Sequence, residues 1–411
     1  MNSQEIFGIA LGLSEPWFIE RVELTTEATP TSFRELHIHI NFRKGWKFQT
    51  GDGASCGAYD TEDRTWQHLD FFQHKCYLHA RVPRIKLPDG KVSQVQVPWA
   101  RPNSGFTLLF EAYAMLLIES EMPVCKASDC LRVTAPRVWR IFNYWIGLAK
   151  SKDDLSEVQR VGIDETSSKK GHNYVTVVAD IDTSRTIYAC PERDAAVVDA
   201  FAQELESKGG SVENISLVSM DMSPAFIAGA LDTFPLAKIV FDKFHIIQSV
   251  NKAMDEVRKA ERKGNELLKT HKYTVLRKYA NLTDEKKAAL EELVMMYPIL
   301  GDAYRLKELL GDVYHIPEPE EAKGYLWFWC DLAHDSGIQP FKKVAAMIRS
   351  HWSGVVAHFD TGITNGLLEG INSKIQLAKR RARGYRNIDN YINMIYFLTA
   401  KLKFDYPHYP L

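Results

Sequence analysis

Three acidic residues stand where their side chains could do chemistry together. Asp164 lies in VGIDETSSKKG, Asp221 in ISLVSMDMSPAF and Glu369 in TNGLLEGINSKIQ. The first two stand at the ends of apolar, β-prone runs, and the third lies on a helix-like segment that turns strongly basic. Although most of the 52 acidic residues must be solvated surface, the strand context separates Asp164 and Asp221 from that background. Carboxylates brought together in this way hold two divalent cations that act on a phosphodiester.

The metal expected at such a site is Mg²⁺, with Mn²⁺ able to substitute. Mg²⁺ prefers hard oxygen ligands and keeps several of its waters, so three carboxylates are enough to hold two ions per active site. One ion would activate an attacking water or 3′-hydroxyl, and the other would stabilise the leaving oxygen.

A basic segment follows Glu369 closely. Between positions 374 and 386 there is no acid and there are six basic residues, namely Lys374, Lys379, Arg380, Arg381, Arg383 and Arg386. A charge run is usually only a solvated face. Because this one begins five residues after Glu369 in a chain of formal net charge −1, it favours a local contact with DNA phosphates.

The bulk properties place the chain among ordinary globular proteins of several domains. Its 411 residues are too many for one core, and 45% are hydrophobic and 25% charged. No run of 18 apolar residues predicts a membrane span, and the apolar start lacks the features of a signal peptide. The six scattered cysteines indicate reduced thiols and a cytoplasmic location.

The hydrophobic pattern predicts a multidomain α+β chain. Residues 1–98 are β-rich, with alternation of period two in ELHIHINF. Residues 99–157 predict a helix-turn-helix, in which Pro123 opens one helix and Thr134 caps the next. Arg137 and Arg140 near the start of that second helix would then reach the major groove of DNA. The alternative is a plain helical hairpin in a linker.

Residues 158–251 predict the element order β-β-β-α-β-α-β, which is the RNase H-like arrangement of a mixed five-stranded sheet with helices. In this arrangement the ends of the first and fourth strands, with Asp164 and Asp221, lie side by side. Residues 252–345 are almost entirely helical in pattern and predict an inserted helical domain. Residues 346–411 then form the second part of the catalytic domain, with the basic helix.

The chain resembles the DDE transposases of the ISL3 insertion-sequence family. The resemblance is carried by VGIDETSSKKGHNYVTVVADID, SMDMSPAFIAGALDTFP, FDKFHIIQSVNKAMDEVRK and GLLEGINSKIQLAKRRARGYRN, and extends to the N-terminal DRTWQHLDFF. It implies that Asp164, Asp221 and Glu369 are the catalytic, metal-binding acids. It also implies an acid-x-x-His motif at Asp242 to His245, in which His245 contacts a catalytic carboxylate or the scissile phosphate.

One departure from the family concerns zinc. ISL3-like enzymes usually begin with a Cys-x-x-Cys region and a second Cys pair, whereas here Cys56 remains, Gly53 takes its partner's position and KLPDGK replaces the second pair. Residues 1–98 therefore predict a degenerate zinc-ribbon-like domain in which structural zinc is doubtful. His74, Cys76 and His79 are the alternative ligands.

The leading hypothesis is a bacterial, nucleoid-associated transposase. It would bind the terminal inverted repeats and target DNA as a homodimer or higher homo-oligomer, cut the 3′ ends and join them by transesterification. One alternative is a transposase-derived DNA-binding protein without catalysis, and another is an RNase H-like, structure-selective nuclease.

Overall fold

The chain folds into two compact units in a computed structural model. The structure describes residues 2–25, 34–49, 55–87, 89–169, 173–191, 196–262, 267–363 and 366–407. The first unit consists of Met1–Ser151 with Lys403–Leu411, and the second of Lys152–Leu402. The tail from 403 therefore belongs to the first unit, whereas the sequence analysis placed all of 346–411 with the catalytic domain. Among the described residues no helix is both long enough and apolar enough to cross a bilayer.

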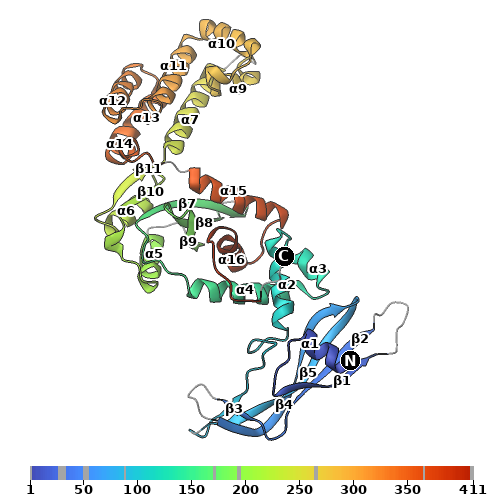
Figure 1. The fold of residues 1–411 in the computed structure, drawn as a ribbon. Coiled ribbons are helices and arrows are strands. Elements are labelled where there is room, and N and C mark those ends of the chain that lie inside the picture. The colour runs from blue at the N-terminus through green and yellow to red at the C-terminus, as the bar shows by residue number, and fades with distance from the viewer. Residues whose placement is uncertain are drawn as a thin grey trace. The chain divides into compact units, whose positions relative to one another are not determined.

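The first unit is built on a six-stranded sheet of mixed direction, with the order β1-β2-β5-β4-β3 and β6 paired to β5 (Figure 1). Its elements are α1 (Ser3–Ala10), β1 (Trp17–Leu24), β2 (Glu35–Phe42), β3 (Lys47–Gln49), β4 (Ser55–Phe71), β5 (His74–Lys86) and β6 (Val92–Gln94). Leu36, Ile38 and Ile40 of β2 are buried in alternation with less buried residues, as the pattern predicted. The β-rich prediction is confirmed, with an additional helix at the start of the chain.

The alternative zinc ligands do not come together in this sheet. Cys76 is almost completely buried among the apolar side chains of the core face. His79 lies three residues further along β5 and therefore on the opposite face, because side chains alternate along a strand. There it contacts His37 and Thr65. The remaining position of the lost Cys pair, Gly53, lies outside the described residues.

The helix-turn-helix follows the sheet as α2 (Leu108–Glu119), α3 (Val124–Cys130) and α4 (Ala135–Ser151). The turn between α3 and α4 occurs at Leu131–Thr134, as predicted. A fully buried carboxylate, Glu111 of α2, accepts hydrogen bonds from Arg101, Ser104 and the indole of Trp145 in α4. Because a buried charge is stable only when it is paired and hydrogen-bonded, this network fixes α4 against α2.

The second unit contains a five-stranded mixed sheet of order β11-β10-β7-β8-β9. Its elements are β7 (Arg160–Lys169), β8 (Asn173–Asp180), β9 (Arg185–Cys190), α5 (Ala196–Ser207), η1 (Val212–Asn214), β10 (Leu217–Met220), α6 (Pro224–Thr233) and β11 (Lys238–Phe241). Strands β7, β8 and β9 pair antiparallel, while β10 pairs parallel to both β7 and β11. The predicted element order is confirmed.

Two strand boundaries differ from the prediction. Asp164 does not end its strand, because antiparallel pairing to β8 extends β7 to Lys169. Conversely, the last strand predicted in residues 158–251, AKIVFDKFH at positions 237–245, does not continue through His245. Strand β11 ends at Phe241, and Asp242 caps the next helix by accepting the backbone N–H of Phe244 at 3.0 Å. An Asp at the N-cap satisfies an N–H that has no partner within the helix, and this favours helix over strand there.

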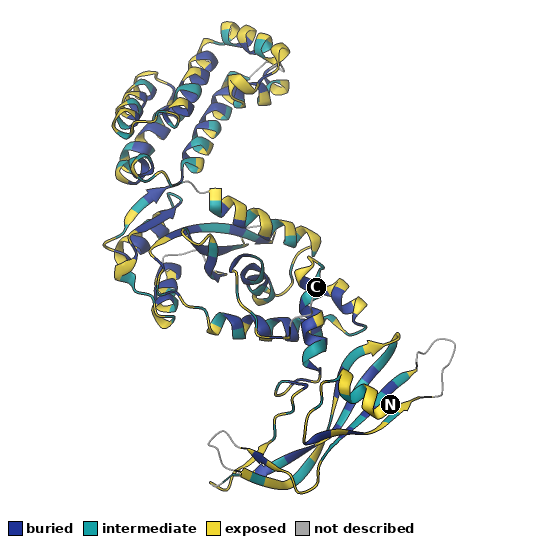
Figure 2. Ribbon diagram, in the orientation of Figure 1, coloured by how far each residue is buried: buried dark blue, intermediate teal, exposed yellow. Residues whose placement is uncertain are grey.

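The helical part of this unit shares its hydrophobic core with the sheet. Its elements are α7 (Lys243–Glu261), α8 (Leu267–Thr270), α9 (Lys272–Leu276), η2 (Tyr279–Asn281), α10 (Asp284–Met296), α11 (Pro298–Val313), α12 (Pro319–Asp335), α13 (Gln339–Ser350), α14 (Trp352–Thr361), α15 (Gly366–Arg381) and α16 (Ile388–Thr399). Buried side chains form one continuous cluster from β7 through α7 to α13. Figure 2 colours the buried residues along these elements dark blue. The helices predicted for 252–345 are present, but α7 begins earlier, directly after β11.

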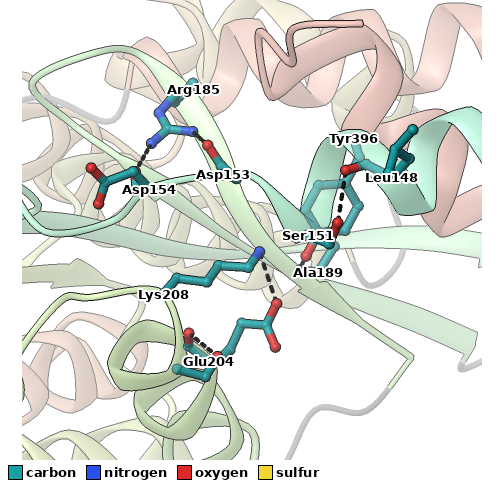
Figure 3. Close-up of polar contacts among 10 residues, drawn as sticks. Leu148, Ser151, Asp153, Asp154, Arg185, Ala189, Glu204, Lys208 and Tyr396 are labelled. Atoms are coloured by element: carbon teal, nitrogen blue, oxygen red, sulfur yellow. Dashed lines mark hydrogen bonds and ion pairs between the residues drawn. The ribbon is translucent and has the colours of Figure 1, made fainter. Parts of the chain in front are cut away.

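Helices cover both faces of the second sheet. Val161 and Ile163 of β7 pack in the same cluster as Phe201 of α5 and Phe226 of α6. The intervening residues of β7 face α15, and Thr186 of β9 contacts Thr399 of α16 at 2.8 Å. Polar contacts secure the edge strand β9 (Figure 3): Arg185 donates to the Asp153 carboxylate, and the Ala189 N–H donates to the hydroxyl of Tyr396.

We expect Gly354→Ala to destabilise the second unit. A Cβ at Gly354 of α14 would lie 2.4 Å from the ring of Phe241, the last residue of β11. Overpacking of this kind costs about 1–3 kcal/mol. Gly324→Ala is the matched control, because that helical position has nothing within 4 Å, and alanine there should stabilise by about 0.5–1 kcal/mol. Urea denaturation, monitored by circular dichroism, gives the free energy of unfolding of both variants. Equal changes in the two would contradict the packing argument.

Candidate active site

Asp164 and Asp221 are placed side by side by the register of two parallel strands. Gly162 of β7 pairs with Ser219 of β10, and each aspartate follows its strand's paired residue by two positions. Because two residues bring a side chain back to the same face of a strand, both carboxylates lie on the face of Gly162. The predicted neighbourhood of these two acids therefore follows from the pairing itself.

A third carboxylate belongs to the same edge of the sheet. Met220 pairs with Phe241, so Asp242 follows β11 at the level at which Asp221 follows β10. The N–H of Asp242 donates to the carbonyl of Met220 at 3.1 Å, which continues the ladder to this level. Asp242 is largely buried. The sequence predicts Asp242 only as part of the acid-x-x-His motif. In the structure it stands with Asp164 and Asp221 at this sheet edge, and these three residues are called the acidic cluster below.

Helix α15 runs along β7 in matching steps (Figure 1). Leu368 occupies the space over Gly162, where a Cβ would meet it at 2.8 Å. The Asn372 amide donates to Oδ2 of Asp164 at 2.7 Å, and the Gln376 amide donates to the hydroxyl of Thr166 at 2.7 Å. Four helical residues advance about 6 Å and two strand residues about 6.6 Å, so the contacts repeat in phase.

Burial makes Asp164 an unusual carboxyl group. Desolvation raises its pKa from 3.8 to about 6, and the nearby carboxylates of Asp242 and Asp221 add to the increase. The backbone N–H of Glu165 and the His245 side chain act in the opposite direction, because both favour the charged form. His245 is therefore close enough to Asp164 to influence its charge.

Glu369 lies on α15 one residue beyond Leu368 and is exposed. It lines a cavity of about 420 Å³ together with Asp242 at the start of α7. The structure thus brings Asp164, Asp221, Asp242 and His245 together and sets Glu369 beside Asp242, on the cavity side of α15.

The chemistry of these side chains fits a divalent cation, although their present positions do not form a ligand shell. All four acids offer the hard oxygen ligands that Mg²⁺ prefers. Among the described residues, however, no three His, Cys, Asp or Glu side chains stand close enough to hold a metal ion as they lie. Both oxygens of Asp164 accept hydrogen bonds, and Oδ1 of Asn372 is buried with no hydrogen-bond partner in the described part of the chain. An unsatisfied buried oxygen beside the carboxylates is consistent with a cation that completes the site.

The chain is similar to known proteins over most of its length. Residues 161–395 match a family model of the DDE ISL3 type described as "Transposase", and residues 95–146 match the helix-turn-helix domain of transposase family ISL3. The chain is 30% identical to the transposase for insertion sequence element IS1557 of Mycobacterium tuberculosis, over 94% of this chain and 93% of that protein. It is 28% identical to the transposase for IS1001 of Bordetella parapertussis, over 92% and 94%. The chain belongs to the ISL3 family of transposases.

The basic residues of this ISL3 transposase lie in different surroundings. Five of the six are exposed: Lys374, Arg380 and Arg381 on α15, and Arg383 and Arg386 after it. Lys379 is partly buried and donates to the carbonyl of Ser167 at 2.6 Å, so it also holds α15 on β7.

Arg137 and Arg140, the two arginines predicted to reach the major groove from the second helix of the helix-turn-helix, also differ in their exposure. Arg140 is exposed on α4. Arg137 instead lies over the ring of Phe106 at 4.3 Å and donates to Gln67. Its guanidinium therefore packs within the first unit, whereas Arg140 presents its charge to solvent.

Sequence reasoning missed Asn372, the direct partner of Asp164. A signal was present, because residues 368, 372 and 376 are spaced by four and share one face of α15. Only the position of β7 beneath that face distinguishes them from other polar helix residues.

We expect Asp164→Asn to stabilise the fold at neutral pH. The pKa of Asp164 is raised in the folded state, so its ionisation destabilises the fold as the pH rises from about 4 to above 6. The neutral amide avoids this cost, which we put on the order of 1–2 kcal/mol. Denaturation curves at pH 4 and 7.5 should show the gain only at the higher pH. Asp232→Asn, an exposed acid on α6, is the control, and a gain equal at both pH values would refute the argument.

Proposed function

We propose that the second unit is an RNase H-like catalytic domain that cleaves and joins DNA strands with Mg²⁺, two ions per active site. The observation that supports this most directly is the shared register of Asp164 and Asp221 under α15, the helix that carries Glu369. Divalent ions bound there would supply the activated nucleophile and the stabilised leaving oxygen.

The protein's own residues would orient and protect that chemistry. Asn372 holds the carboxylate of Asp164 in place through Oδ2, and the Glu165 N–H holds it through Oδ1. Asp242 would add a further carboxylate ligand or orient Asp221 beside it. His245 would contact Asp164 or a bound phosphate, and its proximity to Asp164 partly offsets the rise in the pKa of that acid.

We propose that the first unit recognises the terminal inverted repeats and that several copies act together on the two ends. Helix α4 would enter the major groove and present Arg140, while Arg137 would position the helix on its neighbours rather than read bases. The basic segment of α15 would contact phosphates of the end or target DNA close to the catalytic acids.

Glu369→Gln and Asp221→Asn should each reduce cleavage and joining by about 100-fold or more. Both changes remove a charge from the proposed metal site and leave the surface that binds DNA. The measurement is strand cleavage and joining on duplexes that carry the element's own ends, with Mg²⁺. Glu285→Gln, which changes an exposed acid of α10, is the control and should be fully active.

Two other outcomes would favour a different function. DNA binding without cleavage by the wild type would favour a non-catalytic DNA-binding protein, and cleavage indifferent to sequence would favour a structure-selective nuclease.

The combined variant Lys374→Ala, Arg380→Ala and Arg383→Ala should bind DNA with a weaker salt dependence. Each lost phosphate contact reduces the slope of log K against log salt by about 0.9, so the sum approaches roughly 3. Sequence preference should not change, because phosphate contacts carry no base information. Fluorescence anisotropy at several salt concentrations measures the slope, and an unchanged value would mean that this segment does not contact DNA.

A further inference from the structure

The cavity beside Glu369 is bounded by three parts of the second unit. The start of α7 contributes Lys243 and Phe244, the end of α11 contributes Tyr314 and His315, and Glu369 comes from α15. Its volume of about 420 Å³ falls within the range of ordinary ligand pockets. Because Asp242 also lines it, the cavity adjoins the acidic cluster.

Lysine side chains line the cavity together with the carboxylates of Asp242 and Glu369. Nζ of Lys278 lies 3.2 Å from Nε2 of His315. Because a lysine ammonium has three N–H donors, this contact leaves donors that a ligand can use. Gly311 makes room for the Lys278 ammonium, because a Cβ there would come within 3.3 Å of this nitrogen. Together with Lys243, this ammonium suits a phosphate group.

Tyr314 lines the cavity, but its hydroxyl oxygen is buried and offers no surface to a ligand. Burial raises the pKa of this phenol, and nearby Asp242 adds to the increase, so the side chain stays uncharged. The cavity therefore meets an uncharged aromatic side chain at this position, beside the lysines.

The rim of the cavity carries an exposed aromatic ring. Phe244 is 51% exposed although it lies only two residues after Asp242, and its ring meets that of His245 edge-on at 5.8 Å. A fixed, exposed ring next to catalytic carboxylates offers a platform on which a nucleic-acid base can stack.

We propose that this cavity binds the nucleotide next to the scissile phosphodiester. Lys278 and Lys243 contact its phosphate, and Phe244 stacks on the base. The helical insertion would thereby form one wall of the substrate site. The proposal rests on the proposed function, which makes DNA the substrate of the adjoining acids.

Lys278→Ala should reduce the salt slope of DNA binding by about 1 and weaken binding equally for all sequences. Lys286→Ala is the matched control, since Lys286 is an exposed lysine of the same insertion that does not line the cavity. The probe is the duplex bearing the element's end, studied by anisotropy without divalent ions.

A second variant separates binding from folding, because the ring of Phe244 is 51% exposed and its loss should leave the melting temperature unchanged. Phe244→Leu should weaken binding about fivefold or more and abolish the fluorescence change of 2-aminopurine placed beside the cleavage site. Phe328→Leu, at a comparably exposed ring of α12, should do neither.

The outcomes distinguish this proposal from the function on which it rests. A wild type that binds and cleaves, with cavity variants indistinguishable from Lys286→Ala and Phe328→Leu, overturns the cavity assignment alone. A wild type that binds none of the duplexes overturns both. The assignment is supported if Lys278→Ala reduces the salt slope of DNA binding and Phe244→Leu abolishes the 2-aminopurine signal.

Discussion

The contact between α15 and β7 is the constraint on which the site depends. A helix and a strand advance at different rates, and they stay in phase here because four helical residues cover nearly the same length as two strand residues. Gly162 permits the close approach, Asn372 holds Asp164, and Lys379 closes the far end. An acid on this helix is therefore brought to the sheet edge although it lies more than 200 positions along the chain from Asp164.

The acids meet at an electrostatic cost that the fold offsets elsewhere. Desolvation and neighbouring carboxylates raise the pKa of Asp164 to about 6. The core beneath the sheet is large and continuous, so it can stabilise such a cluster. Carboxylates that disfavour one another's charge are also the groups that gain most from a cation, which connects the instability of the site to its proposed chemistry.

The helical insertion is integrated with the sheet. Helix α7 begins directly after β11, α14 returns to pack Gly354 against Phe241, and buried side chains continue from one part to the other. The insertion thereby places Lys278 and Tyr314 at the same cavity as Asp242, the residue that follows β11. A wall of the proposed nucleotide site is thus supplied by a segment that a minimal sheet-and-helix core would not contain.

Local pattern in the sequence was sufficient to predict the strands and helices, the helix-turn-helix and the positions of Asp164 and Asp221. These features depend on periodicity, capping and turn residues, which act over a few positions. The early start of α7 follows from the local N-cap at Asp242. The extension of β7, the roles of Asp242 and Asn372 at the site, and that of Arg137 in the first unit were decided only by tertiary structure. Each depends on a partner far away in the chain, such as β8 for β7 or Asp164 for Asn372. Such partners are chosen by packing of the whole unit, and no short-range period records them.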